Sequence, residues 1–214
     1  MGPGAAIAAC AAGVAVLLAA EKRNSQRGIW IAKPWASLSF IVVAVAGGAL
    51  NSAYGKWILL GLLLCLAGDL LLIPVQPPAV FRVGVFAFLL GHVAFATAFL
   101  TQPLEKGWLA AAALALALLL AVVWRWLAPS LPADMKPAVV AYFIVIGTMS
   151  ALACAVTAAG GPAGIALGAL AFTASDVAVA RDRFVRHEFI NRAWGLPLYY
   201  LAQVLLALTP AALA

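Results

Sequence analysis

Eight stretches of mostly apolar residues, each long enough to cross a bilayer, follow one another along this chain with little between them. Breaking the sequence at its charges and its Pro and Gly clusters places them at about 4–20, 32–50, 57–74, 81–101, 107–127, 137–159, 163–181 and 194–212. A membrane-spanning helix needs about 20 apolar residues. Because 66% of the 214 residues are hydrophobic and only 9% are charged, an ordinary soluble domain is excluded. The sequence predicts an all-α fold in which residues 1–214 form one bundle of eight transmembrane helices.

Lysine and arginine are distributed unevenly between the two ends of these spans. Of the 13 such residues, only Lys56 and Lys106 lie in the loops after the second, fourth and sixth spans. Because cytoplasmic loops carry the excess of Lys and Arg, we expect the other loops to be cytoplasmic and both termini to lie outside. The first span has no basic residue before it, so we expect a retained helix rather than a signal peptide.

The net charge of +6 is explained by this basic face, which would meet anionic headgroups or an anionic substrate. We therefore expect membrane lipids as partners and no nucleic acid. The alanine-rich composition is typical of a bacterium with a GC-rich genome, which points to a multi-pass protein of the inner membrane.

The two halves of the chain resemble each other. Lys33-Pro34 opens the second span and Lys136-Pro137 the sixth, while Gly68-Asp69-Leu70 in the third span is answered by Ser175-Asp176-Val177 in the seventh. Four spans per half give both halves the same orientation, so the pattern predicts a parallel repeat of residues 1–104 and 105–214. Chance similarity between simple apolar segments is the alternative.

Two aspartates inside predicted spans are the most informative single residues. An ionised side chain at the centre of a membrane-spanning helix costs roughly 2.5–3.5 kcal/mol. Asp69 and Asp176 lie inside spans, each toward the cytoplasmic end of its helix. Small residues accompany Asp69 along one face of its helix, which favours close helix packing. Other polar side chains converge on the same half of the bundle: Lys33, His92, Arg183, Tyr199 and Gln203. Each also has a purely structural explanation, such as an interhelical hydrogen bond, a core histidine or an interfacial anchor.

No familiar catalytic motif occurs in the sequence, such as a GxSxG elbow, an HExxH pair or a Walker loop. We expect no metal and no cofactor. His92 is the one histidine within a predicted span, so a multi-histidine zinc site is excluded, and Asp69, Asp176 and His92 together are the alternative set of metal ligands. Two nearby carboxyl groups in a medium of low dielectric constant cannot both ionise. The pair Asp69 and Asp176 would then supply a proton donor beside a base.

Short motifs occur in order from the second span to the eighth: Lys33-Pro34, Gly68-Asp69, Phe81-x-x-Gly84, Phe88-x-x-Gly91-His92, Ser175-Asp176, Arg183-Phe184 and Tyr199-Tyr200-x-x-Gln203. In this order and spacing they resemble the lysoplasmalogenase family, the YhhN-like membrane proteins. The resemblance implies a hydrolase that cleaves the vinyl-ether bond of a lysophospholipid, with Asp69 and Asp176 as catalytic residues. It implies supporting or substrate-binding roles for Lys33, His92, Arg183, Tyr199 and Gln203.

A vinyl ether is cleaved after protonation of its β-carbon, and a buried carboxylic acid is a suitable donor. Arg183 shares a helix face with Asp176, so we expect it to keep Asp176 ionised and to leave Asp69 as the acid. We expect Lys33 and Arg183 to bind the lipid phosphate, and Phe81, Phe88 and Phe95 to line the tunnel for the chain.

Two other function classes remain open from the sequence. Intramembrane carboxylates in a parallel repeat are also typical of a proton-coupled transporter of small molecules or lipids. The aspartates could instead serve only to join helices. Because many bacteria make no plasmalogens, a different ether or enol lipid is the alternative substrate.

Overall fold

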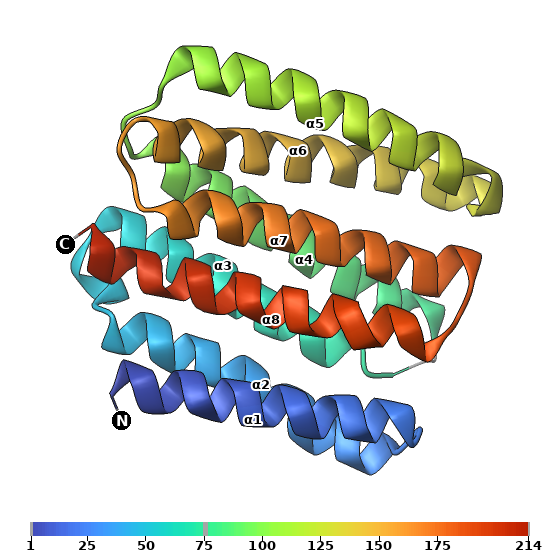
Figure 1. The fold of residues 1–214 in the computed structure, drawn as a ribbon. Coiled ribbons are helices and arrows are strands. Elements are labelled where there is room, and N and C mark those ends of the chain that lie inside the picture. The colour runs from blue at the N-terminus through green and yellow to red at the C-terminus, as the bar shows by residue number, and fades with distance from the viewer. Residues whose placement is uncertain (1, 75–76, 214) are drawn as a thin grey trace.

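The computed structural model describes residues 2–74 and 77–213, and all regular structure within them is helical (Figure 1). Eight long helices follow one another, joined by short turns. Their bounds are α1 (Pro3–Lys22), α2 (Gln26–Ala46), α3 (Ala53–Leu71), α4 (Pro78–Leu100), α5 (Lys106–Leu127), α6 (Lys136–Ala158), α7 (Ala163–Ala180) and α8 (Phe189–Ala212). The turns contain η1 (Ala49–Asn51), η2 (Ala128–Ser130), η3 (Ala133–Met135) and the single π-helical turn η4 (Arg181–Val185).

All eight helices are long and apolar enough to cross a membrane, which confirms the predicted fold class. The largest boundary error is in the second span, which was expected to begin at residue 32. Ser25 instead caps α2, since its Oγ accepts a hydrogen bond from the Gly28 amide at 3.2 Å. Lys33 and Pro34 therefore lie two turns inside the helix. This shift carries the Lys33 side chain into the bundle, where it is 6% exposed.

Six of the helices form a closed ring around the interior of the bundle. Going round it, α2 packs against α3, α3 against α4, α4 against α6, α6 against α7, α7 against α8, and α8 against α2. The remaining two helices lie outside this ring, α1 against α2 and α8, and α5 against α6 (Figure 1). The internal repeat predicted from the sequence stays a prediction.

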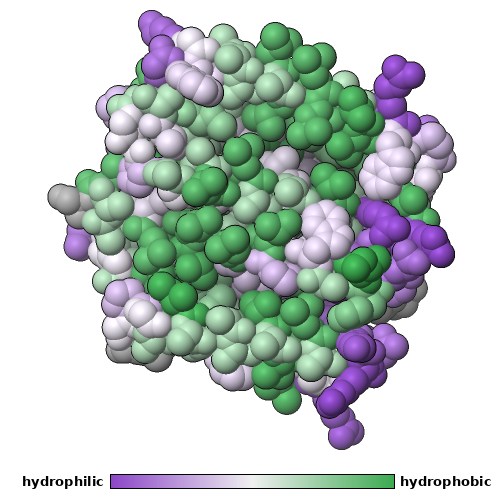
Figure 2. Space-filling view, in the orientation of Figure 1, coloured by the Kyte–Doolittle hydropathy of each residue, from purple (hydrophilic) through white to green (hydrophobic). Residues whose placement is uncertain are grey.

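The surface of the bundle is that of a multi-pass integral membrane protein. Figure 2 shows apolar side chains over most of one face and hydrophilic side chains gathered mainly at the end where the α1–α2, α5–α6 and α7–α8 connections lie in Figure 1. Large exposed hydrophobic residues are spread along the helices, for example Ile31, Leu118 and Ile144. We call the end with the hydrophilic side chains the basic end, because nearly all Lys and Arg residues lie there.

Glycines on α3 allow α4 to approach closely, as the small-residue face predicted. A Cβ atom at Gly68 would lie 2.6 Å from the Phe88 ring, and one at Gly61 would overlap the Phe95 ring. Both rings are buried, so they fill the interior of the bundle rather than line an open tunnel. The absence of side chains at these two positions therefore sets the spacing of α3 and α4 beside Asp69.

A polar network closes the basic end of the bundle. Asp182 in η4 is 7% exposed and accepts hydrogen bonds from the Arg192 guanidinium at 2.9 and 3.1 Å and from Asn191 at 3.1 Å. Arg192 also pairs with Glu21 at the end of α1, at 3.3 Å. These contacts hold the α7–α8 turn and α1 in fixed positions below the interior.

Candidate functional site

Asp69 lies in the last turn of α3 at the centre of a buried polar cluster. The Lys33 Nζ atom is 3.4 Å from Asp69 Oδ1, and both side chains are under 10% exposed. The Ser37 and Tyr199 hydroxyl groups donate hydrogen bonds to Asp69 Oδ2, at 2.7 and 2.6 Å. Behind Ser37, the Tyr200 hydroxyl lies 3.1 Å from its Oγ. Helices α2 and α8 thus present one cation and two donors to a single carboxyl group.

These contacts favour the ionised form of Asp69. Hydrogen-bond donors and a nearby cation stabilise a carboxylate, whereas burial without them would favour the neutral acid. Lys33 is a donor with no accepting capacity, so it adds to the same effect. Asp69 is therefore suited to act as a base or to stabilise a positive charge.

Asp176 lies one turn from the end of α7 and has a different environment. The Tyr142 hydroxyl on α6 donates a hydrogen bond to Asp176 Oδ2 at 2.8 Å. The Nε2 atom of His92 on α4 faces the same oxygen at 3.7 Å, and the Asp176 side chain is 21% exposed. No ion pair with Lys or Arg occurs at Asp176 among the described residues.

The tautomer of His92 follows from the hydrogen-bond partner of its Nδ1 atom. His92 Nδ1 lies 2.7 Å from the Phe88 carbonyl oxygen, so Nδ1 carries a proton and donates it. In the neutral ring Nε2 is then an acceptor, and it has no hydrogen-bond partner although it is buried. Because Nε2 can accept a hydrogen bond but not donate one, its position opposite Asp176 favours the protonated form of the Asp176 carboxyl group. Asp176 is therefore suited to act as a proton donor.

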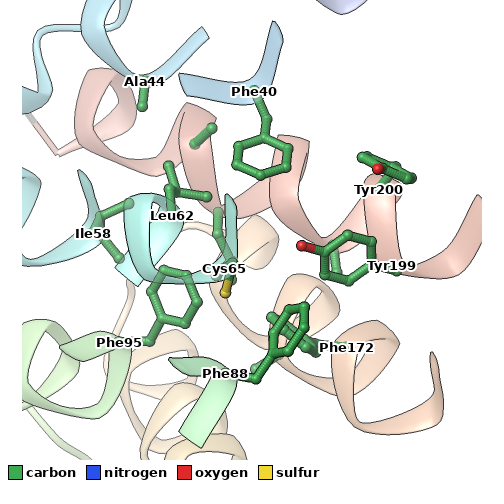
Figure 3. Close-up of a cluster of buried hydrophobic side chains, with 14 of the residues drawn as sticks. Phe40, Ala44, Ile58, Leu62, Cys65, Phe88, Phe95, Phe172, Tyr199 and Tyr200 are labelled. Atoms are coloured by element: carbon green, nitrogen blue, oxygen red, sulfur yellow. The ribbon is translucent and has the colours of Figure 1, made fainter. Parts of the chain in front are cut away.

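Aromatic rings connect the two polar clusters, and Figure 3 shows Phe88, Phe172 and Tyr199 gathered together in the interior. The Phe172 ring centroid is 4.3 Å from that of His92 and 5.4 Å from that of Tyr199. Phe88 packs edge-on against both Phe172 and Tyr199, at 6.3 and 5.9 Å. The wall between the two polar clusters is thus apolar and aromatic, a surface that fits hydrocarbon rather than water.

Gln203 on α8 is the remaining polar group of the interior. It is fully buried and approaches the Cys65 thiol of α3, but neither its amide nitrogen nor its amide oxygen makes a regular hydrogen bond. Together with His92 Nε2, these two atoms are the only buried side-chain nitrogen or oxygen atoms without a partner in the described part of the chain. Buried polar groups are normally paired. The unpaired amide marks a place for a polar ligand group or water.

Six of the seven predicted supporting and catalytic positions lie in these clusters. Lys33 and Tyr199 contact Asp69, while His92 faces Asp176, and Gln203 lies on the same helix one turn beyond Tyr199.

Arg183 is the exception. Its guanidinium lies over the Phe81 ring, 4.2 Å from the centroid, and the side chain is exposed at the basic end. The expected approach of Arg183 to Asp176 is therefore not seen in the structure. The reason is the π turn: the Arg186 amide bonds to the Arg181 carbonyl in an i to i+5 pattern at 2.8 Å. This wider turn rotates the residues after Ala180 away from the face that Asp176 occupies.

Three site residues were not predicted from the sequence: Ser37, Tyr142 and Tyr200. A signal existed for Tyr142, because a tyrosine more than one turn inside a span needs a partner for its hydroxyl group. Ser37 is one helical turn from Lys33, so it becomes a candidate once α2 is known to begin before Lys33. Among the described residues, no group of three His, Cys, Asp or Glu side chains is placed to hold a metal ion.

Comparison with known proteins places these residues in a wider group. The sequence model of the YhhN family matches residues 28–209, from α2 to α8. The chain is 35% identical to "Lysoplasmalogenase TMEM86B" of Sus scrofa over 178 residues, which cover 82% of this chain and 71% of the relative. It is 30% identical to "Lysoplasmalogenase TMEM86A" of Bos taurus over 176 residues, covering 79% and 71%. No solved structure matches.

Proposed function

The chain belongs to the YhhN family, and from this membership we propose that it is a membrane hydrolase that cleaves the vinyl-ether bond of a lysoplasmalogen. The products are a fatty aldehyde and a glycerophospho-headgroup alcohol. The enzyme names of both relatives support this class, and neither is named as a transporter. The observation that carries the proposal is the contrast between two carboxyl groups: Asp69 faces a cation and two donors, while Asp176 faces one donor and one acceptor.

The contrast supports an acid role for Asp176 and a base role for Asp69. Asp176 gives its proton to the β-carbon of the vinyl ether, where the C=C electron pair forms the new C–H bond. The α-carbon and the ether oxygen then share a positive charge, which the Asp69 carboxylate stabilises. Water adds to the α-carbon and its proton passes to Asp69. The hydroxyl proton of the resulting hemiacetal passes to Asp176, and Asp69 protonates the glycerol oxygen as its bond to carbon breaks, which restores both carboxyl groups to their starting forms.

Neighbouring groups support each step. As Asp176 loses its proton, the Tyr142 hydroxyl donates to the developing carboxylate. Lys33 and Tyr199 favour the ionised form of Asp69 against the effect of its burial. From the sequence we expected Arg183 to keep Asp176 ionised and Asp69 to be the acid. The proposed assignment is the reverse, because the nearest cation is Lys33 and it lies beside Asp69.

We place the lipid headgroup at the basic end and its chain among the aromatic rings, which pack against one another in this structure and must separate to admit it. Lys33 is committed to Asp69 and buried, so phosphate binding falls to Arg183, which is exposed and held over Phe81. Gln203 provides amide hydrogen-bonding capacity for the reacting oxygen or for water. The excess of Lys and Arg at this end supports a cytoplasmic location for it, with both termini outside.

The activity is tested by aldehyde release from purified protein. A lysoplasmalogen is the substrate, and the alkyl-ether lysolipid of the same chain length is the control. We expect aldehyde from the vinyl ether alone, with at least a thousandfold loss in Asp69→Asn and in Asp176→Asn. Folded protein that releases no aldehyde from any vinyl-ether lysolipid would contradict the proposal.

The assignment of acid and base needs a separate test. The pH profile of kcat/KM should be bell-shaped, with an acidic limb from the base and an alkaline limb from the acid. Tyr142→Phe removes a donor from Asp176, so it should move the alkaline limb to higher pH. Ser37→Ala removes a donor from Asp69 and should move only the acidic limb, also to higher pH. The opposite pairing of variants and limbs would reverse the assignment.

A further inference from the structure

Helix α5 is held by the bundle along one side only. It packs along α6 and otherwise meets η2 and η4 at the basic end. Only 11% of this span is buried, the smallest share among the eight. Because the span is mostly apolar, hydrophobic side chains make up most of its exposed surface. Leu118 and Val122, for example, are more than 60% exposed.

A groove runs between α5 and α6 on the outside of the ring. Its volume is about 490 Å³, and its lining is apolar apart from the Thr148 hydroxyl. The largest side chains that line it are Leu116, Leu120 and Trp124 from α5 and Val140, Phe143 and Ile144 from α6. Gly147 deepens it, since a Cβ atom there would come within 3.0 Å of Leu120. In Figure 2 the face over α5 and α6 is largely apolar up to the hydrophilic side chains at its right-hand edge.

The length of the groove identifies the kind of occupant. Along α5 it extends from Ala113 to Trp124, which is about 16 Å at 1.5 Å per residue. The hydrocarbon core of a bilayer is about 30 Å thick, so the groove has the depth of one leaflet. A transmembrane helix of another protein would lie along the whole of α5. One acyl chain from the leaflet at the basic end fits the observed extent.

Charges lie where the headgroup of such a lipid would be. Arg125 is one turn beyond Ala121 of the groove, and Lys136 is one turn before Val140, so each continues a groove-lining face to the basic end. Both are exposed, and neither forms an ion pair in the part of the chain that the structure describes. The nearby Asp134 is paired with Arg82 at 2.6 Å.

We propose that this groove is a binding site for an anionic glycerophospholipid of the surrounding membrane. One acyl chain lies between α5 and α6, and the phosphate contacts Arg125 and Lys136. The lipid fills the space beside a helix that has few protein neighbours, so it stabilises the attachment of α5. The site lies outside the ring and is separate from Asp69 and Asp176, so it does not depend on the proposed hydrolase activity.

The test compares two lipids of the same acyl chains on the purified protein in detergent. We expect phosphatidylglycerol to be retained in native mass spectra and, at about ten times its Kd, to raise the unfolding midpoint by about 3–6 °C. Phosphatidylcholine should give a smaller shift. The double variant Arg125→Gln with Lys136→Gln should lose the difference between the lipids. The matched double variant Lys56→Gln with Lys106→Gln, at the other end of the bundle, should keep it.

The acyl-chain part is tested by filling the groove. Ala117→Phe places a ring in the groove and should abolish the shift from either lipid, whereas Ala115→Phe, on the exposed side of the same helix, should not. Equal shifts from both lipids in the wild type would overturn the proposal. So would a preference for phosphatidylglycerol that survives the Arg125 and Lys136 substitutions, or lipid shifts that survive Ala117→Phe. These readouts need no catalytic activity.

Discussion

Replacing Lys33 with methionine should lower both the stability and the activity of this protein. The ion pair with Asp69 joins atoms 3.4 Å apart, with the two side chains 8% and 3% exposed. With an effective dielectric constant of about 20, the attraction of unit charges at that distance is about 5 kcal/mol. Removing one partner of a buried pair typically costs about 3–5 kcal/mol, since the other charge is left without compensation. For a chain of this size that corresponds to a midpoint lower by roughly 6–20 °C.

The assay is a double-mutant cycle on thermal unfolding in detergent. Lys33→Met and Asp69→Asn should each be strongly destabilising, while the double variant should be much more stable than the sum of the two effects predicts. Activity should be lost in all three, because none keeps an ionised Asp69. Lys56→Met, an exposed lysine at the other end, should shift the midpoint by no more than about 2 °C. Small single effects, or additive ones, would refute a charged Lys33–Asp69 pair.

Three further predictions follow from single contacts. Gly68→Ala should destabilise the protein by about 1–3 kcal/mol, because its Cβ atom would overlap the Phe88 ring, while Gly4→Ala in open space should have little effect in the same unfolding assay. Tyr142→Phe should lower kcat about tenfold in the aldehyde assay, through loss of about 1.4 kcal/mol of transition-state stabilisation, and an unchanged kcat would exclude a role in proton transfer. Arg183→Gln should raise KM for the lysolipid several-fold with little change in kcat, and the reverse result would contradict headgroup binding.

The residues that lie where the sequence placed them are those whose signal does not depend on the direction in which a helix face points. Asp69 and Asp176 are conspicuous because ionisable groups are costly in a span, whatever face they occupy. The eight spans follow from length and composition. The depth of Tyr199 and His92 in the bundle was also predictable, because depth is set by the constant rise of 1.5 Å per residue.

The errors arose where local backbone geometry changes the direction in which residues point around a helix. Arg183 is seven residues from Asp176, which is two turns of an α-helix, but the π turn at Arg181–Val185 removes that alignment. Ser37 was missed because Lys33 was taken as the start of a helix that actually begins at Gln26. A π turn and a serine cap are determined by a few hydrogen bonds, which composition and periodicity do not reveal.

The order of helices around the ring has a consequence for how the chain enters the membrane during synthesis. Lys33 and Ser37 on α2 precede Asp69, and His92 and Tyr142 on α4 and α6 precede Asp176. A lone carboxylate costs roughly 2.5–3.5 kcal/mol at the centre of an inserting helix. Here the helices that carry Asp69 and Asp176 enter the bilayer after helices that already hold partners for their carboxyl groups. Biogenesis from the N-terminus can therefore proceed without either aspartate waiting unpaired in lipid.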